Sequence, residues 1–353
     1  DNEQKLDLLK RSLLEIDDLR SAGAVLAWDQ TTYMPAGGSA SRARQRATLS
    51  RFAHQKATAA ELGCLLDALE ASGEDLSEPE ASLVRVARRD FEKANKIPAS
   101  FVERASAHRS QSYAAWIQAR EEDDFAATAP YLRTSIDLSR EYAEFFAPFA
   151  HICDPLIDDT DEGMTVAEVR QIFSELRPAL VDLTRDIGNR PQVSHACLKG
   201  AFGEDQQLAL ALSAVEKIGY DLARGRLDKT VHPFCTRFSS GDVRITTRTR
   251  KDEFCEAFFS TLHEAGHALY EQGVSEDFDG SPLGRGASAG LHESQARLWE
   301  NNVGRSYPFW EYWYPVLQET FPANYADVSL QEFYAAINRV ERSLIRTDAD
   351  EVT

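Results

Sequence analysis

The sequence predicts a mainly α-helical protein with one small β-hairpin. Apolar residues recur every three to four positions over most of the 353 residues, and charged residues fill the positions between them. A single stretch, residues 236–248, has the composition and alternation of paired strands. A hydrophobic content of 43% with 27% charged residues is typical of a globular protein with a large core. We therefore expect one helical domain over residues 1–353.

The expected helices follow one another along the N-terminal half of the chain. Five apolar residues at helical spacing mark the first one: Leu6, Leu9, Leu13, Ile16 and Leu19. Further helices are expected near residues 40–55, 57–71, 79–96, 101–121 and 130–147. Thr165 and Glu168 form a capping box, which predicts the start of a helix that continues through Leu176.

A break precedes that capping box, at residues 153–163. Pro155 cannot continue a preceding helix, and the acidic residues 158–163 show no apolar period. We interpret the segment as a solvated turn, not as a linker between independent domains.

Residues 236–248 are expected to form the hairpin, with two β-prone runs around a Ser-Ser-Gly-Asp turn. On the second strand, Asp242, Arg244 and Thr246 alternate onto one face. Because this polar face directly precedes the next helix, it would form one wall of a cleft. The alternative is a strand edge that faces solvent.

The most informative motif is His-Glu-x-x-His at residues 263–267. On a helix, His263 and His267 lie one turn apart on the same face, so two imidazole nitrogens can bind one metal ion. Glu264 lies beside them, where its carboxylate can reach a water at that ion. Two histidine ligands and a carboxylate base are the arrangement of a zinc hydrolase. The alternative is a pair of ordinary histidines on a helix.

The surrounding residues predict the helix that the motif requires. Asp252 is a plausible N-cap, and Phe254, Phe258 and Leu262 recur at helical spacing. Gly266 lies inside this helix, where glycine costs about 1 kcal/mol relative to alanine. A glycine there suggests close packing beside the metal.

A catalytic zinc site needs a third protein ligand. Residues 291–300 are expected to form a second helix, and they offer His292 and Glu293. Adjacent residues on a helix point about 100° apart, so we expect only one of these two to bind the ion.

Other motifs accompany His-Glu-x-x-His in a fixed order. They are Leu26-Ala27-Trp28-Asp29-Gln30 running to Met34-Pro35, His232-Pro233-Phe234, Asp242-Val243-Arg244-Ile245-Thr246, His292-Glu293-Ser294-Gln295 and Ile345-Arg346-Thr347-Asp348-Ala349-Asp350. With these motifs the chain resembles the thermostable, Taq-type metallocarboxypeptidases over essentially its whole length.

The resemblance implies which residues form the site. In that family the ligands are the two motif histidines and the glutamate of His-Glu-Ser-Gln, which here are His263, His267 and Glu293, with Glu264 as general base. It also implies a helical zinc metallopeptidase with a long cleft, which releases single residues from peptide C-termini, and a homodimer. The ligands suit zinc, and cobalt or manganese could occupy the same site.

Release of a C-terminal residue requires a cation that binds the substrate carboxylate. We expect Arg346 in this role, because a guanidinium can bind a carboxylate bidentately and because it matches the arginine of the family's Ile-Arg motif. Arg244 and His232 are second candidates for substrate contacts. Arg346 could instead pair with Asp348 or Asp350, and the alternative activity is then that of a zinc endopeptidase or a dipeptidase-type peptidase.

The family pattern continues past the Ile-Arg motif into a C-terminal segment that contains Gly-x-x-Gln, whereas this sequence ends at Thr353. From this difference we expect an exposed apolar patch that includes Leu344, Ile345 and Val352. We also expect zinc binding with poor turnover of peptides.

Composition limits the partners and the location. A net charge of −18 argues against nucleic acid and anionic membranes, because both bind basic patches. Peptides are the expected partners. The 5 cysteines are widely spaced and form no Cys-x-x-Cys pair, which indicates reduced thiols and a cytoplasmic protein.

Two other enzyme patterns are weaker. Residues 286–290 match Gly-x-Ser-x-Gly, but a loop precedes them and the acid-then-histidine order of a serine hydrolase does not follow. Glu264 and His267 also match the metal-binding pair of di-iron helical bundles. That class needs a second such pair, and no other histidine in the sequence has a glutamate three residues before it.

Overall fold

The computed structural model describes residues 2–72 and 76–340. These residues group into two compact units, each built from several segments of the chain. Unit 1 takes the described residues up to Gly163 together with Thr236–Asp242 and Val274–Ala287. Unit 2 takes Met164–Cys235, Val243–Gly273 and the described residues from Ser288 onward. The single domain and the long cleft expected above stay predictions.

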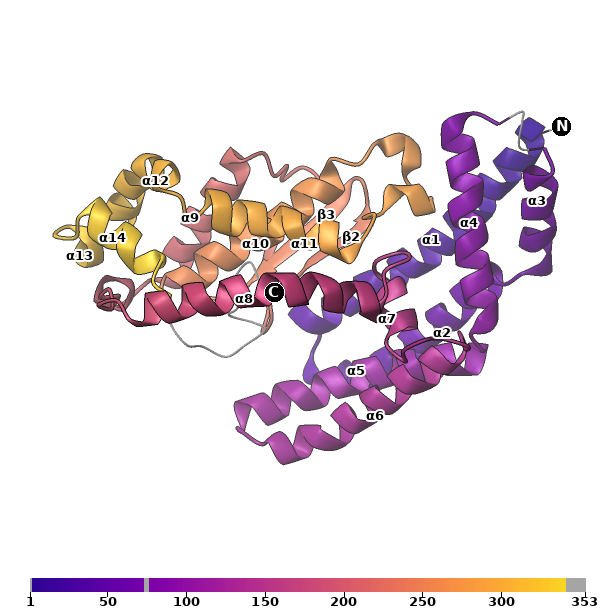
Figure 1. Ribbon diagram of the computed structural model, residues 1–353, viewed down its shortest axis with the longest axis horizontal. Coiled ribbons are helices and arrows are strands. Elements are labelled where there is room, and N and C mark those ends of the chain that lie inside the picture. The colour runs from indigo at the N-terminus through magenta and orange to yellow at the C-terminus, as the bar shows by residue number, and fades with distance from the viewer. Residues whose placement is uncertain (1, 73–75, 341–353) are drawn as a thin grey trace. The chain divides into compact units, whose positions relative to one another are not determined.

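Unit 1 is largely helical (Figure 1). Its helices are α1 (Asn2–Thr32), α2 (Ser39–Ala57), α3 (Ala60–Glu70), α4 (Glu78–Lys96), α5 (Ala99–Glu121), α6 (Phe125–Glu144) and α7 (Asp154–Asp158). Each helix that the apolar periodicity predicts here is present. Fully buried Leu9, Leu66 and Leu69 join α1 to α3, and leucine and valine side chains of α4 complete this core.

The break at residues 153–163 contains a short helix. α7 begins at Asp154 with Pro155 in its first turn, a position where a proline costs no hydrogen bond. At its end, the Asp158 carboxylate lies 2.6 Å from Lys93 Nζ and accepts a hydrogen bond from the Gly163 amide at 2.8 Å. The expectation of a solvated turn is therefore wrong for residues 154–158, because proline stops a preceding helix but can start a new one.

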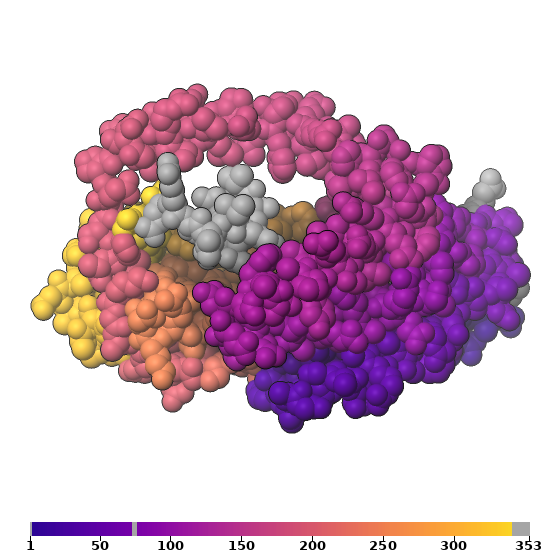
Figure 2. All heavy atoms as spheres, turned by 90° about the horizontal axis from the view of Figure 1, so that it is seen from below, coloured from indigo at the N-terminus to yellow at the C-terminus, as the bar shows by residue number. Residues whose placement is uncertain are grey.

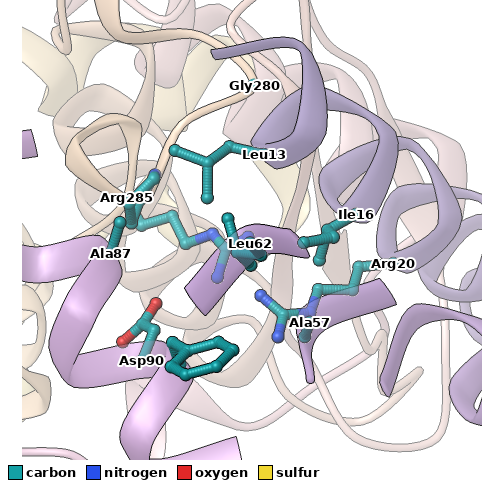
Figure 3. A pocket seen from close by; sticks show the side chains of 11 residues that line it. Leu13, Ile16, Arg20, Ala57, Leu62, Ala87, Asp90, Gly280 and Arg285 are labelled. Atoms are coloured by element: carbon teal, nitrogen blue, oxygen red, sulfur yellow. The ribbon is translucent and has the colours of Figure 1, made fainter. Parts of the chain in front are cut away.

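A small pocket opens in unit 1 (Figure 3). Its walls are mainly apolar, and the guanidinium ends of Arg20 and Arg285 point into it near Asp90. Arg285 is paired with buried Asp17 at 2.7 Å. The pocket volume of about 30 Å³ is room for roughly two water molecules, so it is too small for the end of a peptide.

Unit 2 combines helices with most of the sheet. Its helices are α8 (Val166–Gly188), α9 (Glu204–Lys217), α10 (Cys255–Gln272), α11 (Ala289–Arg297), α12 (Tyr307–Thr320), α13 (Pro322–Tyr325) and α14 (Leu330–Ile337). The capping box of Thr165 and Glu168 at the start of α8 is confirmed. The core is rich in aromatic side chains, among them fully buried Phe254, Trp310 and Phe333. Among the described residues, no helix has both the length and the apolar character needed to cross a membrane.

The sheet has three strands in the order β1-β3-β2. They are β1 (Leu227–Lys229), β2 (Cys235–Ser239) and β3 (Asp242–Thr247). The hairpin of β2 and β3 confirms the expectation from residues 236–248. β1 pairs in parallel with β3, with Leu227 opposite Ile245, and was not expected, because three residues are too few to show alternation.

The two faces of β3 differ as the alternation predicts. Val243 and Ile245 are fully buried in the core, whereas Asp242 and Arg244 are half-buried. Thr246, expected on the polar face, is fully buried as well. Its hydroxyl accepts a hydrogen bond from the Phe234 amide at 2.8 Å and so holds the segment that leads into β2.

Candidate metal centre

The helix that carries the motif, α10, starts later than expected. Phe254 is its N-cap residue and Cys255 its first residue. Asp252 does not cap it, since its carboxylate pairs with the Arg250 guanidinium at 3.2 Å. Burial of Phe258 and Leu262 fixes the opposite face of α10 in the core. His263 and His267 therefore lie together on the half-buried face, as predicted.

The structure brings together the three residues expected as ligands. Glu293 Oε2 lies 3.6 Å from His263 Nε2 and 3.4 Å from His267 Nε2. The three ligand atoms all lie within 4.8 Å of one another. Ligands at about 2.0–2.1 Å from a tetrahedral zinc lie roughly 3.3–3.4 Å apart, and both distances from Glu293 to the histidines are close to that value. Two imidazoles and a carboxylate are also a donor set that zinc prefers.

Close packing of α10 on α11 places Glu293 beside the histidines. Figure 1 shows the two helices side by side. They meet at Gly266, where an added Cβ would lie only 2.6 Å from Ala296 Cα and from the Gln295 carbonyl oxygen. The close packing expected at this glycine is confirmed, and any larger residue would push the third ligand away.

Of the two adjacent candidates on α11, only Glu293 joins the ligand group. The His292 ring instead stacks on the His267 ring, with centroids 4.5 Å apart and planes at 19°. His292 Nε2 lies 2.9 Å from Glu271 Oε1, within hydrogen-bonding distance. His292 thus packs against the ring of the ligand His267. It does not join the ligand group, because adjacent residues on a helix point in different directions.

A second layer of charged side chains surrounds the ligands, and the sequence analysis missed it. His263 Nδ1 lies 2.8 Å from Glu300 Oε2. Arg297 Nε donates to Glu293 Oε1 at 3.0 Å. The spacing of the residues could have indicated it. Arg297 and Glu300 lie four and seven residues after Glu293 and so recur on the same face of the helix.

Glu264 is buried, with 6% of its surface exposed. Burial raises its pKa to about 8, and the nearby charges of Glu293 and Glu300 act in the same direction. The Cys235 backbone at the start of β2 donates a hydrogen bond to its carboxylate. A dication between the ligands would favour the charged form and lower this pKa again. The β element thus lies beside the site, as expected.

The pKa values of the three ligands and of Glu300 are shifted from their ordinary values, some upward and some downward. Hydrogen bonding to His267 is the main cause that lowers the Glu293 pKa to about 2. Burial raises the pKa of Glu300, but its contacts with His263 and its two neighbouring arginines outweigh burial and lower it. Burial also lowers the His267 pKa, whereas the surrounding carboxylates outweigh burial and raise that of His263.

The residues expected to contact substrate are not part of the ligand group. Arg244 lies on β3 and is half-buried, and His232 lies on the segment between β1 and β2 and is exposed. Arg346 lies outside the described residues, as do Leu344, Ile345 and Val352 of the expected apolar patch. Their roles stay predictions.

Comparison with known proteins identifies the family. The family model described as "Carboxypeptidase Taq (M32) metallopeptidase" matches residues 8–353. The chain belongs to the M32 carboxypeptidase family. Thermostable carboxypeptidase 1 of Thermus thermophilus is 42% identical over 349 residues, which are 95% of this chain and 68% of that protein. Carboxypeptidase 1 of Bacillus subtilis is 37% identical over 350 residues, which are 98% of this chain and 69% of that protein.

A solved M32 structure has the same fold as this chain. The crystal structure of the M32 carboxypeptidase from Deinococcus radiodurans R1 matches with a TM-score of 0.88 and 47% identity, over 99% of this chain and 70% of that chain. This M32 protein is thus a metallocarboxypeptidase, a hydrolase that releases residues from peptide C-termini. The family decides for the carboxypeptidase and against the endopeptidase and di-iron alternatives.

Proposed function

We propose that this metallocarboxypeptidase uses zinc, held by His263, His267 and Glu293, and that Glu264 is its general base. The observation that carries the proposal is the convergence of the three ligand atoms within 4.8 Å on the α10 face that also carries Glu264. Cobalt or manganese in place of zinc is the alternative that the same donor set allows.

When bound, the ion supplies a Lewis acid that polarises the scissile carbonyl and makes a nearby water more acidic. The protein residues supply the rest. Glu264 accepts a proton from the attacking water and then delivers it to the leaving amine. Burial and a hydrogen bond from the Cys235 backbone hold this carboxylate in place, one residue away from the ligand His263.

Selection of the peptide C-terminus needs a cation for the terminal carboxylate. We assign this contact to Arg346, from its place in the Ile-Arg motif, and secondary contacts to Arg244 and His232. Single residues are then released one after another. The family resemblance also supports a homodimer, and the free thiols of all 5 cysteines support a cytoplasmic location.

Replacement of the proposed base tests the mechanism. Glu264→Gln keeps the size of the side chain but removes the proton acceptor, so turnover of a blocked peptide should fall by about 10²–10⁴-fold with the metal still bound. Metal analysis and mass spectrometry of the peptide ladder measure both. Glu311→Gln, an exposed site on α12, is the control. Near-normal turnover in Glu264→Gln would overturn the assignment.

A second experiment tests the substrate contact. Arg346→Ala should slow processing of peptides with a free C-terminal carboxylate far more than any cleavage of C-terminally amidated ones. Equal losses on both substrates would mean that Arg346 is structural.

A further inference from the structure

Two of the three ligands, His263 and Glu293, each use one polar atom toward the other ligands and the second polar atom for a contact with a charged side chain. His263 presents Nε2 to Glu293, while its Nδ1 lies 2.8 Å from Glu300 Oε2. Glu293 presents Oε2 to both histidines, while its Oε1 accepts a hydrogen bond from Arg297 Nε at 3.0 Å. Each ligand has only two polar atoms, so the partner of one atom decides where the other points.

Glu300 determines the tautomer of His263. Its Oε1 lies 3.6 Å from Arg305 Nη2 and its Oε2 lies 3.8 Å from Arg297 Nη1, and these two cations keep it a carboxylate. A carboxylate only accepts hydrogen bonds, so His263 Nδ1 must carry the proton. When the ring is neutral, the lone pair then resides on Nε2, the nitrogen that faces Glu293.

The supporting residues are themselves fixed. The Arg305 guanidinium lies 4.0 Å from the centre of the Phe259 ring and donates to the Ile337 carbonyl at 2.7 Å. Glu300 lies in a π-helical turn, Leu298–Val303, that continues α11. Its side chain is mostly buried, at 16% exposure. A group held this firmly can impose an orientation on its neighbour.

We propose that Glu300 and Arg297 are coupled positioning residues, which preset His263 and Glu293 for metal binding and act as one unit through the Arg297–Glu300 contact. The proposal rests on the ligand set of the proposed function and goes beyond it. It leaves His267 as the less constrained ligand. The Nδ1 of His267 is buried and has no hydrogen-bond partner among the described residues, and its ring is held by the stack on His292.

A double-mutant cycle on metal affinity tests the proposal, with chelator competition for zinc as the measurement. Glu300→Gln should weaken zinc binding by about 10–100-fold, because outer partners of ligands typically contribute that much. Its amide can also donate to Nδ1 and so favour the wrong tautomer. Arg297→Gln should weaken binding as well. The double variant should lose less than the product of the two single losses, because the shared contact is lost only once. Glu311→Gln is the control.

The tautomer can be read directly, without metal or substrate. Nitrogen NMR of the metal-free protein, at a pH where His263 is neutral, should show the proton on Nδ1 in the wild type and a shift toward Nε2 in Glu300→Gln. A residue with a merely structural role would not change this signature. Unchanged zinc affinity in Glu300→Gln, an unchanged tautomer, or losses that multiply in the double variant would each overturn the proposal. If the wild type binds no zinc, the proposed function fails, and the NMR spectra still decide whether Glu300 sets the tautomer.

Discussion

At the scale of single residues, side chains that are adjacent in the sequence have different roles in the metal centre, because they point in different directions. Glu293 and His292 are adjacent on α11, yet one joins the ligand group and the other stacks behind His267. Glu264 and His263 are adjacent on α10, and one is the proposed base while the other is a ligand. The role of each side chain in the metal centre therefore depends on its exact position in the helix and not on the overall polarity of the segment.

The division between His292 and Glu293 leads to a prediction about metal occupancy. Glu293→Ala removes one of three ligands and should reduce the metal content of purified protein severely. His292→Ala leaves all three ligands and should keep the metal, with at most a modest loss of affinity from the missing ring stack. Metal analysis by mass spectrometry after dialysis measures both variants. If His292→Ala were the variant that loses its zinc, the third ligand would be off by one residue.

At the scale of secondary structure elements, the contact between α10 and α11 places the third ligand. An exposed glycine inside a helix is ordinarily improved by alanine, by up to about 1 kcal/mol. At Gly266 the added Cβ would lie 2.6 Å from backbone atoms that cannot move without α11. The steric effect is larger than the propensity here, so this glycine is required by tertiary structure.

A matched pair of substitutions tests this reasoning. Gly266→Ala should destabilise the protein by about 1–3 kcal/mol and weaken zinc binding, because it separates the two ligand helices. Gly23→Ala, inside α1, meets nothing within 4 Å and should be neutral or stabilising. Thermal unfolding and chelator competition measure the two effects. Equal behaviour of the two variants would show that the α10–α11 contact tolerates a methyl group.

The contact between α4 and α7 predicts a pH dependence. Burial raises the Asp158 pKa, but the hydrogen bond from Lys93 and the Gly163 amide outweigh it, so the pKa lies below its ordinary value. A lowered pKa means that Asp158 contributes stability above about pH 4, and that this contribution disappears as pH falls through the folded-state pKa. Because the side chain is partly exposed, we expect less than about 1 kcal/mol.

Urea unfolding between pH 7 and pH 3 measures this contribution. Asp158→Asn should be less stable than the wild type at pH 7, and the difference should shrink toward pH 3. The control is Asp186→Asn, at an exposed site on α8, which should follow the wild type throughout. A difference that stays constant with pH would assign the effect of Asp158→Asn to something other than its charge.

The α8 helix, drawn in pink in Figure 2, has large apolar side chains exposed on its surface. None of its residues is buried, and Phe173 and Leu183 are each 56% exposed. We expect this surface to bind a hydrophobic dye such as ANS, and Phe173→Ser with Leu183→Ser to reduce that fluorescence while zinc affinity stays unchanged. Asp186→Ser is the control on the same helix. Dye fluorescence that persists in the double variant would place the exposed apolar surface elsewhere.

At the scale of the whole molecule, the metal ligands all belong to unit 2. An ion that binds only the folded protein stabilises the elements that hold it. Removal of the metal by a chelator should therefore increase amide hydrogen exchange in α10 and α11 more than in α1, α3 and α4 of unit 1. Exchange measured by mass spectrometry decides this. Equal increases in both units would mean that they open together.

The sequence by itself determined the features that depend on local periodicity. Helices α1 to α6 of unit 1, the hairpin of β2 and β3, and the shared face of His263 and His267 all follow from repeats of 3.6 or two residues, which a short segment shows without its neighbours. The order of the motifs pointed to the family and to Glu293. These predictions needed no knowledge of which segments meet in space.

Only the tertiary structure decided the rest. It decided that α10 starts after Asp252, that β1 joins the sheet, and that Glu300 and Arg297 hold the ligands. The pairing of β1 with β3 and the contact of Glu300 with His263 depend on segments that are far apart in the sequence. Residue spacing shows which side chains share a face, but the packing of two helices decides which of those side chains touch.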